Sequence, residues 1–96
     1  MTEDLQRLHA FVSGRVQGVG FRYFVRTAAQ SLDVSGWVRN RHDGRVELVA
    51  EGLPAQLKEL IRQVGRGPSG SNVKDIEERW NKGMGEFKDF GVKATA

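Results

Sequence analysis

Residues 14–22, GRVQGVGFR, carry the residue types in this chain best suited to chemistry. The stretch places three glycines within seven residues and ends on a phenylalanine and an arginine. Glycine adopts positive φ and lets a ligand approach the backbone closely, and N–H groups at a helix start form a concave anion site. The planar guanidinium of Arg22 can hold two phosphate oxygens at once. We therefore predict an oxyanion cradle for a phosphate, with a plain strand-to-helix turn as the alternative.

Familiar phosphate-binding motifs do not describe this stretch. The chain contains no GxxxxGK[ST] sequence. A GxGxxG motif starting at Gly18 would need glycine at position 23, which is Tyr23. A chain of 96 residues is also too short for a dinucleotide-binding fold. The cradle is therefore of another kind.

Hydrophobic periodicity indicates the elements that hold this cradle. An apolar run ended by Gly14 predicts a strand, and a stripe from Phe21 to Leu32 predicts a helix. Asp43-Gly44 is a strong hairpin signal. We expect strands at 8–13, 34–41, 45–51 and 86–92, and helices at 21–33 and from Pro54 to a capping Gly65.

The segment 72–80 is ambiguous. Val73, Ile76 and Trp80 are spaced three and four residues apart, which locally favours a helix. However, one further strand completes the order β-α-β-β-α-β, typical of a ferredoxin-like fold. We therefore expect a strand here. The predicted fold class is α+β: a two-layer sandwich with two helices on one face of a mostly antiparallel sheet, plus a short C-terminal strand.

This topology places a second polar residue beside the cradle. The first two strands run parallel, with the third between them, so their C-terminal ends lie at one edge of the sheet. The glycine-rich loop leaves the first strand there, and Asn40 lies near the end of the second. Two strand spacings, roughly 9 to 10 Å, separate the two strands. A small ligand in that gap is within reach of both Arg22 and Asn40.

Composition bounds the class of protein. We expect one domain, residues 1–96 with a core of about 7–92. The formal net charge of +3 suits an anionic partner or a solvated basic surface. The chain lacks a long apolar run, an evident secretory signal and cysteine, so we expect a cytoplasmic location without membrane contact. Neither His9 nor His42 has partners at metal-ligand spacing, so we expect no metal site.

Two motifs together resemble one family. GRVQGVGFR at 14–22 is similar to the first signature of the acylphosphatase family. GWVRN at 36–40, followed by Gly44, Val46 and Gly52, resembles the second. The resemblance extends over about 7–92, although the tail after position 82 matches only loosely. It implies a ferredoxin-like sandwich, a strand at about 72–80 and a short fifth strand.

The resemblance also implies an activity: hydrolysis of the carboxyl-phosphate bond of small acyl phosphates by a monomer, without metal or organic cofactor. Arg22 then binds the phosphoryl group and Asn40 positions the attacking water. Inorganic phosphate is the product and an expected inhibitor. The residues implied to contact phosphate are Arg15, Val16, Gln17, Gly18, Val19, Gly20, Phe21 and Arg22.

Two other classes of function share this fold. RNA recognition domains have the same topology, but they carry aromatic residues on the third strand. Here that strand reads RVELVAE, with two glutamates and no aromatic residue, so we expect no nucleic-acid partner. A non-catalytic anion-binding module, or a fragment of a larger carbamoyl-transfer maturation factor, is the other alternative. The free-standing hydrolase is the simpler interpretation because both candidate catalytic residues are present.

Overall fold

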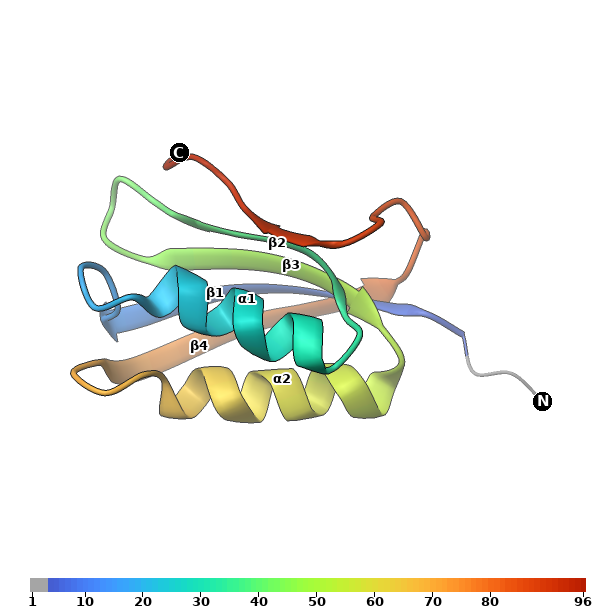
Figure 1. The fold of residues 1–96 in the computed structure, drawn as a ribbon, viewed down its shortest axis with the longest axis horizontal. Helices are drawn as coiled ribbons and strands as arrows, with labels where there is room; N and C mark the ends of the chain where they lie inside the picture. Colours follow the sequence, from blue (N-terminus) through green and yellow to red (C-terminus); the bar gives the residue numbers. More distant parts are fainter. Residues whose placement is uncertain (1–3) are drawn as a thin grey trace.

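The computed structural model describes residues 4–96 as two helices packed on one face of a five-stranded sheet (Figure 1). The elements in chain order are β1 (Gln6–Arg15), α1 (Phe21–Ser31), β2 (Ser35–Asn40), β3 (Val46–Gly52), α2 (Pro54–Arg66), β4 (Asn72–Lys82) and β5 (Phe90–Val92). The strand order is β4-β1-β3-β2-β5. The ferredoxin-like fold class is therefore confirmed. In the described part of the chain, no helix has the length and apolar character needed to cross a membrane.

Strand β3 lies between β1 and β2 and runs antiparallel to both. Val46 pairs with Val12 of β1 on one side and with Asn40 of β2 on the other. The C-terminal ends of β1 and β2 therefore meet at one edge of the sheet, as predicted. Asn40 is level with Val12, two strand spacings or about 10 Å away.

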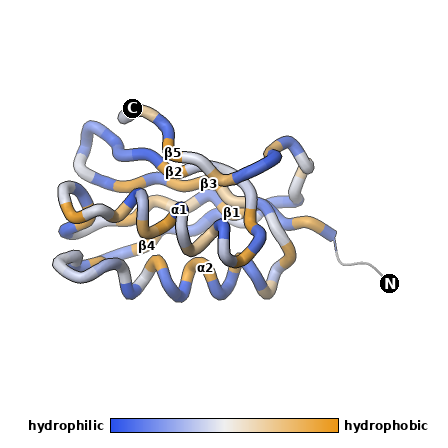
Figure 2. Tube along the Cα trace, viewed as in Figure 1, coloured by the Kyte–Doolittle hydropathy of each residue, from blue (hydrophilic) through white to orange (hydrophobic). Residues whose placement is uncertain are grey.

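The hydrophobic core lies between the helices and the sheet. On α2, Leu57, Leu60 and Val64 are fully buried at helical spacing. The hydrophilic side of this helix is turned away from the sheet (Figure 2). Alternate strand residues, including Val12, Val38 and Val46, cover the inner face. This burial holds the strand ends in register, since a slip of one residue would turn each apolar set to solvent.

Residues 72–80 form part of a regular edge strand, and a β-bulge explains their misleading periodicity. In the β1–β4 pairing, Asp75 faces Ser13 but Val73 faces Gly14, which leaves Lys74 as an extra residue. The bulge brings Val73 and Ile76 to the same face despite an odd spacing, and both pack against the core. Local spacing therefore favoured a helix where tertiary pairing makes a strand.

Several predicted element boundaries were wrong. Helix α2 continues through Gly65, and its C-cap is Gly67 with a φ of 65°. Strand β1 does not end before Gly14, because pairing with β4 continues to Arg15. The last strand, Phe90–Val92, is shorter than expected. Arg7 of β1 forms an ion pair with Glu86, and its guanidinium carbon lies 5.2 Å from the centre of the Phe87 ring, so residues 86 and 87 contact β1 instead of extending the strand beside β2. Helix α1 ends at Ser31, before Asp33, whose φ of 57° is left-handed.

Gly14 is expected to be indispensable for stability. Its φ is 117°, and a Cβ there would overlap the backbone carbonyl oxygen of Asn72 and lie 2.8 Å from the amide nitrogen of Lys74. We expect Gly14→Ala to lower the free energy of unfolding by about 3 kcal/mol or more, because strain and overpacking add. Urea denaturation measures this. Gly91→Ala, at a glycine with open space around it, should change stability by less than about 0.5 kcal/mol. Equal losses would contradict the argument.

Candidate active site

The glycine-rich loop connects β1 to α1 and is fixed at both ends by buried side chains. Val16 is 1% exposed and Phe21, the first residue of α1, is 2% exposed. Between them, Gly18 and Gly20 have φ values of 74° and 76°. A Cβ at either position would meet nothing within 4 Å. These glycines are therefore required for their left-handed backbone, which turns the loop without a side chain over its surface.

The loop and the start of α1 present unused hydrogen-bond donors. Gly20 is the N-cap of α1. No side chain of the described residues caps the helix, and its first turn contains no acidic residue. The first helical bond runs from the Phe24 N–H to the Gly20 carbonyl, at 3.1 Å. Within residues 4–96, no acceptor takes a hydrogen bond from the backbone N–H groups of 16–23. Such donors at a helix N-terminus favour an anion.

Arg22 and Asn40 lie on the same side of the sheet. Arg22 is in the first turn of α1, and Asn40 is the last residue of β2. Asn40 shares its strand face with the buried core residue Val38, so it projects toward the helical layer. Within the described residues, neither side chain makes a hydrogen bond or ion pair with another side chain or the backbone. Both are therefore available to a ligand.

Gln17 connects the two halves of the site. Its side-chain amide donates hydrogen bonds to the carbonyl oxygens of Arg41 at 2.8 Å and Arg45 at 2.9 Å. Arg41 directly follows Asn40, and both carbonyls belong to the β2–β3 hairpin. The structure thus brings the loop against the hairpin that follows Asn40. Arg15, by contrast, is exposed at the end of β1. The catalytic and binding roles of all these residues stay predictions.

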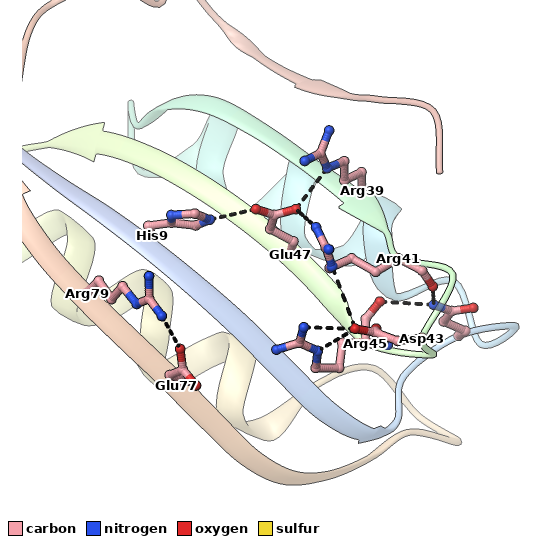
Figure 3. Close-up of polar contacts among 9 residues, drawn as sticks. His9, Arg39, Arg41, Asp43, Arg45, Glu47, Glu77 and Arg79 are labelled. Atoms are coloured by element: carbon pink, nitrogen blue, oxygen red, sulfur yellow. Dashed lines mark hydrogen bonds and ion pairs between the residues drawn. The ribbon is translucent and has the colours of Figure 1, made fainter. Parts of the chain in front are cut away.

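A buried carboxylate behind the hairpin was not predicted from the sequence. Glu47 of β3 is only 3% exposed, although it lies on the sheet face turned away from the helices (Figure 3). It bonds His9 at 2.6 Å through one oxygen, and Arg39 at 2.8 Å and Arg41 at 2.9 Å through the other. The only signal in the sequence was the cluster of arginines around the hairpin.

These contacts keep Glu47 ionised. Burial alone would raise the pKa of its carboxyl, but hydrogen bonds from His9, Arg39 and Arg41 outweigh burial and lower the pKa below its usual 4.5. The group is thus more acidic in the folded chain than in the unfolded one. Its contribution to stability is present above pH 4.5 and is lost as the pH falls from there through the folded pKa.

We expect Glu47→Gln to lower the free energy of unfolding at pH 7 by about 2–4 kcal/mol, because Arg39 and Arg41 lose a charged acceptor and His9 loses its carboxylate partner. The variant should also lose less stability than the wild type between pH 5 and pH 3, since one depressed pKa is gone. Urea denaturation across this range measures both. Glu78→Gln is the control: this glutamate is exposed, and among residues 4–96 it accepts a hydrogen bond only from the Trp80 indole. An unchanged acid slope in Glu47→Gln would contradict the assignment.

Known proteins share the sequence pattern and the fold of this chain. Residues 8–92 match the family model described as acylphosphatase. An acylphosphatase from Roseiflexus sp. (strain RS-1) is 45% identical over 89 residues, covering 93% of this chain and 96% of its own. The crystal structure of acylphosphatase from Bacillus subtilis superposes with a TM-score of 0.89 at 40% identity, covering 92% of this chain and 98% of that one.

A longer protein contains a similar unit. The crystal structure of full-length HypF in the phosphate- and nucleotide-bound form matches 99% of this chain but only 13% of its own, with 31% identity and a TM-score of 0.88. The strand order and the two helices thus define a ferredoxin-like sandwich, with the glycine-rich loop at one edge of the sheet. This chain belongs to the acylphosphatase family.

Proposed function

We propose that the protein hydrolyses small acyl phosphates to a carboxylate and inorganic phosphate. The observation that carries the proposal is the edge where β1 and β2 end. There, a loop with unused amide donors and Arg22 is joined through Gln17 to the hairpin that follows Asn40. Membership of the acylphosphatase family supports the same reaction.

The loop amides and Arg22 hold the phosphoryl oxygens in this mechanism. Phosphoryl transfer passes through a loose transition state, so charge stabilisation and positioning supply most of the catalysis. Arg22 offers two parallel N–H groups to those oxygens. The amides of residues 15–22 complete the shell. Those of 16–22 do so without displacing an internal hydrogen bond, because they have no acceptor within residues 4–96.

Asn40 orients the attacking water. The side-chain oxygen of Asn40 accepts a hydrogen bond from this water, which attacks phosphorus as the bond between phosphorus and the acyl oxygen breaks. The electron pair of that bond leaves with the carboxylate, and a phosphate oxygen accepts the proton of the water. An amide cannot serve as a strong base, and none is needed because a carboxylate is a good leaving group.

The remaining expectations belong to the same proposal. The chain acts as a single domain over residues 1–96 and as a cytoplasmic monomer, with no metal or organic cofactor. Inorganic phosphate is product and competitive inhibitor. No nucleic acid or membrane takes part. On β3, both glutamates of the sheet face turned away from the helices are ion-paired, which is unlike an RNA-stacking surface.

Benzoyl phosphate hydrolysis by the purified chain, with EDTA present and no added metal, tests the proposal. We expect catalysis well above the rate in buffer, with competitive inhibition by inorganic phosphate. A folded wild type without activity would contradict it. That result would favour the alternative, a non-catalytic anion- or RNA-binding module, which phosphate titration and single-stranded RNA filter binding then distinguish.

A further inference from the structure

The side chain of Gln17 lies in the centre of the glycine-rich loop but bonds the hairpin. Its nitrogen Nε2 lies 2.8 Å from the Arg41 carbonyl oxygen and 2.9 Å from the Arg45 carbonyl oxygen. Both partners only accept, and an amide nitrogen has two N–H groups to donate. The two contacts therefore fix the orientation of the amide and use its whole donor capacity. None is left for a phosphate.

The hairpin to which Gln17 bonds is itself held by hydrogen bonds to Glu47 and Asp43. Arg41 donates its backbone N–H to the Arg45 carbonyl oxygen at 2.8 Å, and its Nη1 bonds Glu47 at 2.9 Å. Figure 3 shows this guanidinium between Glu47 and the turn at Asp43. Arg45 bonds Asp43 through its backbone N–H at 3.0 Å and through Nη2 at 2.8 Å. Because these contacts hold the hairpin in place, a hydrogen bond to it from the loop fixes the position of the loop relative to the hairpin.

The contact between Gln17 and the hairpin controls the position of Asn40 relative to the loop. It lies one residue before Arg41, it pairs with Val46 in β3, and its carbonyl accepts the N–H of Ala96 at 3.0 Å. The sheet sets its distance from β1 but not from the loop that leaves β1. Within residues 4–96, the two hydrogen bonds of Gln17 join the loop directly to this hairpin, and they therefore set the distance between the loop and Asn40.

We infer that Gln17 is a positioning residue of the reaction. Its side chain does not touch substrate; it sets the gap between the phosphate-binding amides and the water held by Asn40. The inference rests on the proposed function and adds a specific role to a residue whose backbone amide is expected to bind phosphate. A misplacement of about 1 Å at a reacting centre can reduce a rate about a hundredfold.

Gln17→Met, which keeps the length of the side chain and removes both donors, is the first test. For benzoyl phosphate we expect kcat to fall about ten- to a hundredfold, while the inhibition constant for inorganic phosphate stays within about twofold, since the amides and Arg22 remain. The matched control is Gln30→Met. Gln30 also donates to a backbone carbonyl, that of Phe90 at 3.3 Å, but from the far end of α1, and kcat should not change.

A double-mutant cycle shows whether Gln17 acts through Asn40. In an Asn40→Ala background, Gln17→Met should cost almost nothing further, because the water is already unheld. The same fold loss in both backgrounds would overturn the inference, as would a kcat for Gln17→Met within twofold of wild type. If Gln17→Met does not fold, Gln17→Asn, too short for both carbonyls, takes its place in the cycle.

Gln17→Glu adds a pH-dependent measurement of kcat relative to wild type, which would not change with pH if the role of Gln17 were purely structural. An ionised carboxylate donates no hydrogen bond, whereas a protonated carboxyl donates one. The ratio of variant to wild-type kcat should therefore rise as the pH falls from 7 to 4, and a flat ratio would count against the inference. An inactive wild type would instead refute the proposed function itself, so the two failures are distinguishable.

Discussion

Arg22→Ala should nearly abolish hydrolysis of acyl phosphates. We expect kcat/KM for benzoyl phosphate to fall by about a thousandfold or more, since a guanidinium on a transferring phosphoryl group supplies an effect of this size. The inhibition constant for inorganic phosphate should rise with it, because the same two N–H groups bind the product. Steady-state kinetics measure both quantities.

Stability and a neighbouring arginine provide the controls for Arg22. Within residues 4–96, the Arg22 side chain takes part in no hydrogen bond or ion pair, so Arg22→Ala should unfold at nearly the wild-type temperature. Arg26→Ala, one turn further along α1, removes a guanidinium that lies 4.9 Å from the Tyr23 ring. That variant should keep its activity within about twofold. A folded Arg22→Ala with wild-type kinetics would refute the assigned role.

Asn40→Ala should affect kcat in particular. We expect kcat to fall about a hundred- to a thousandfold, because the water loses the group that orients it. Phosphate inhibition should change little, since the loop amides and Arg22 are intact. The pairing of Asn40 with Val46 uses backbone groups, so the strand is expected to survive the substitution.

Asn81→Ala is the matched control for Asn40. Asn81 is exposed near the end of β4, at the edge of the sheet beyond β1. Its loss should leave kcat unchanged. If Asn40→Ala raised the phosphate inhibition constant as much as Arg22→Ala and left kcat unchanged, Asn40 would be a phosphate ligand, and the account of the attacking water would fail.

The edge that carries the site was predictable from the sequence because strand order determines it. Once β1 and β2 are parallel with β3 between them, their C-terminal ends meet, and both the loop and Asn40 follow. Gly18 and Gly20 signalled a left-handed backbone, which the structure contains. These features depend on local patterns of periodicity and turn chemistry that a single sequence records.

The sequence of residues 72–80 does not by itself determine that β4 is a strand and not a helix. A bulge at Lys74 places Val73 and Ile76 on one face at an odd spacing, which imitates helical periodicity. The bulge arises where β1 and β4 pair, between Ser13 and Gly14. That information is held in the partner strand, so no reading of residues 72–80 alone can supply it.

The roles of Glu47 and of the Gln17 side chain could not be inferred from spacing. Alternation along β3 places Glu47 on the face away from the core, where a glutamate is expected to be exposed. It is buried because His9 of β1 and Arg39 of β2 close over it. Gln17 meets carbonyls 24 and 28 residues away. Both depend on side-chain contacts between distant strands and loops.

An oxygen-18 experiment distinguishes attack of water at phosphorus from attack at the carbonyl carbon. If the loop and Arg22 hold the phosphoryl group while Asn40 presents water to phosphorus, hydrolysis of benzoyl phosphate in water enriched in oxygen-18 should place the label in inorganic phosphate. Mass spectrometry of both products, corrected for the reaction in buffer, measures this. Label in benzoate would mean attack at the carbonyl carbon, and would contradict a site built around the phosphoryl group.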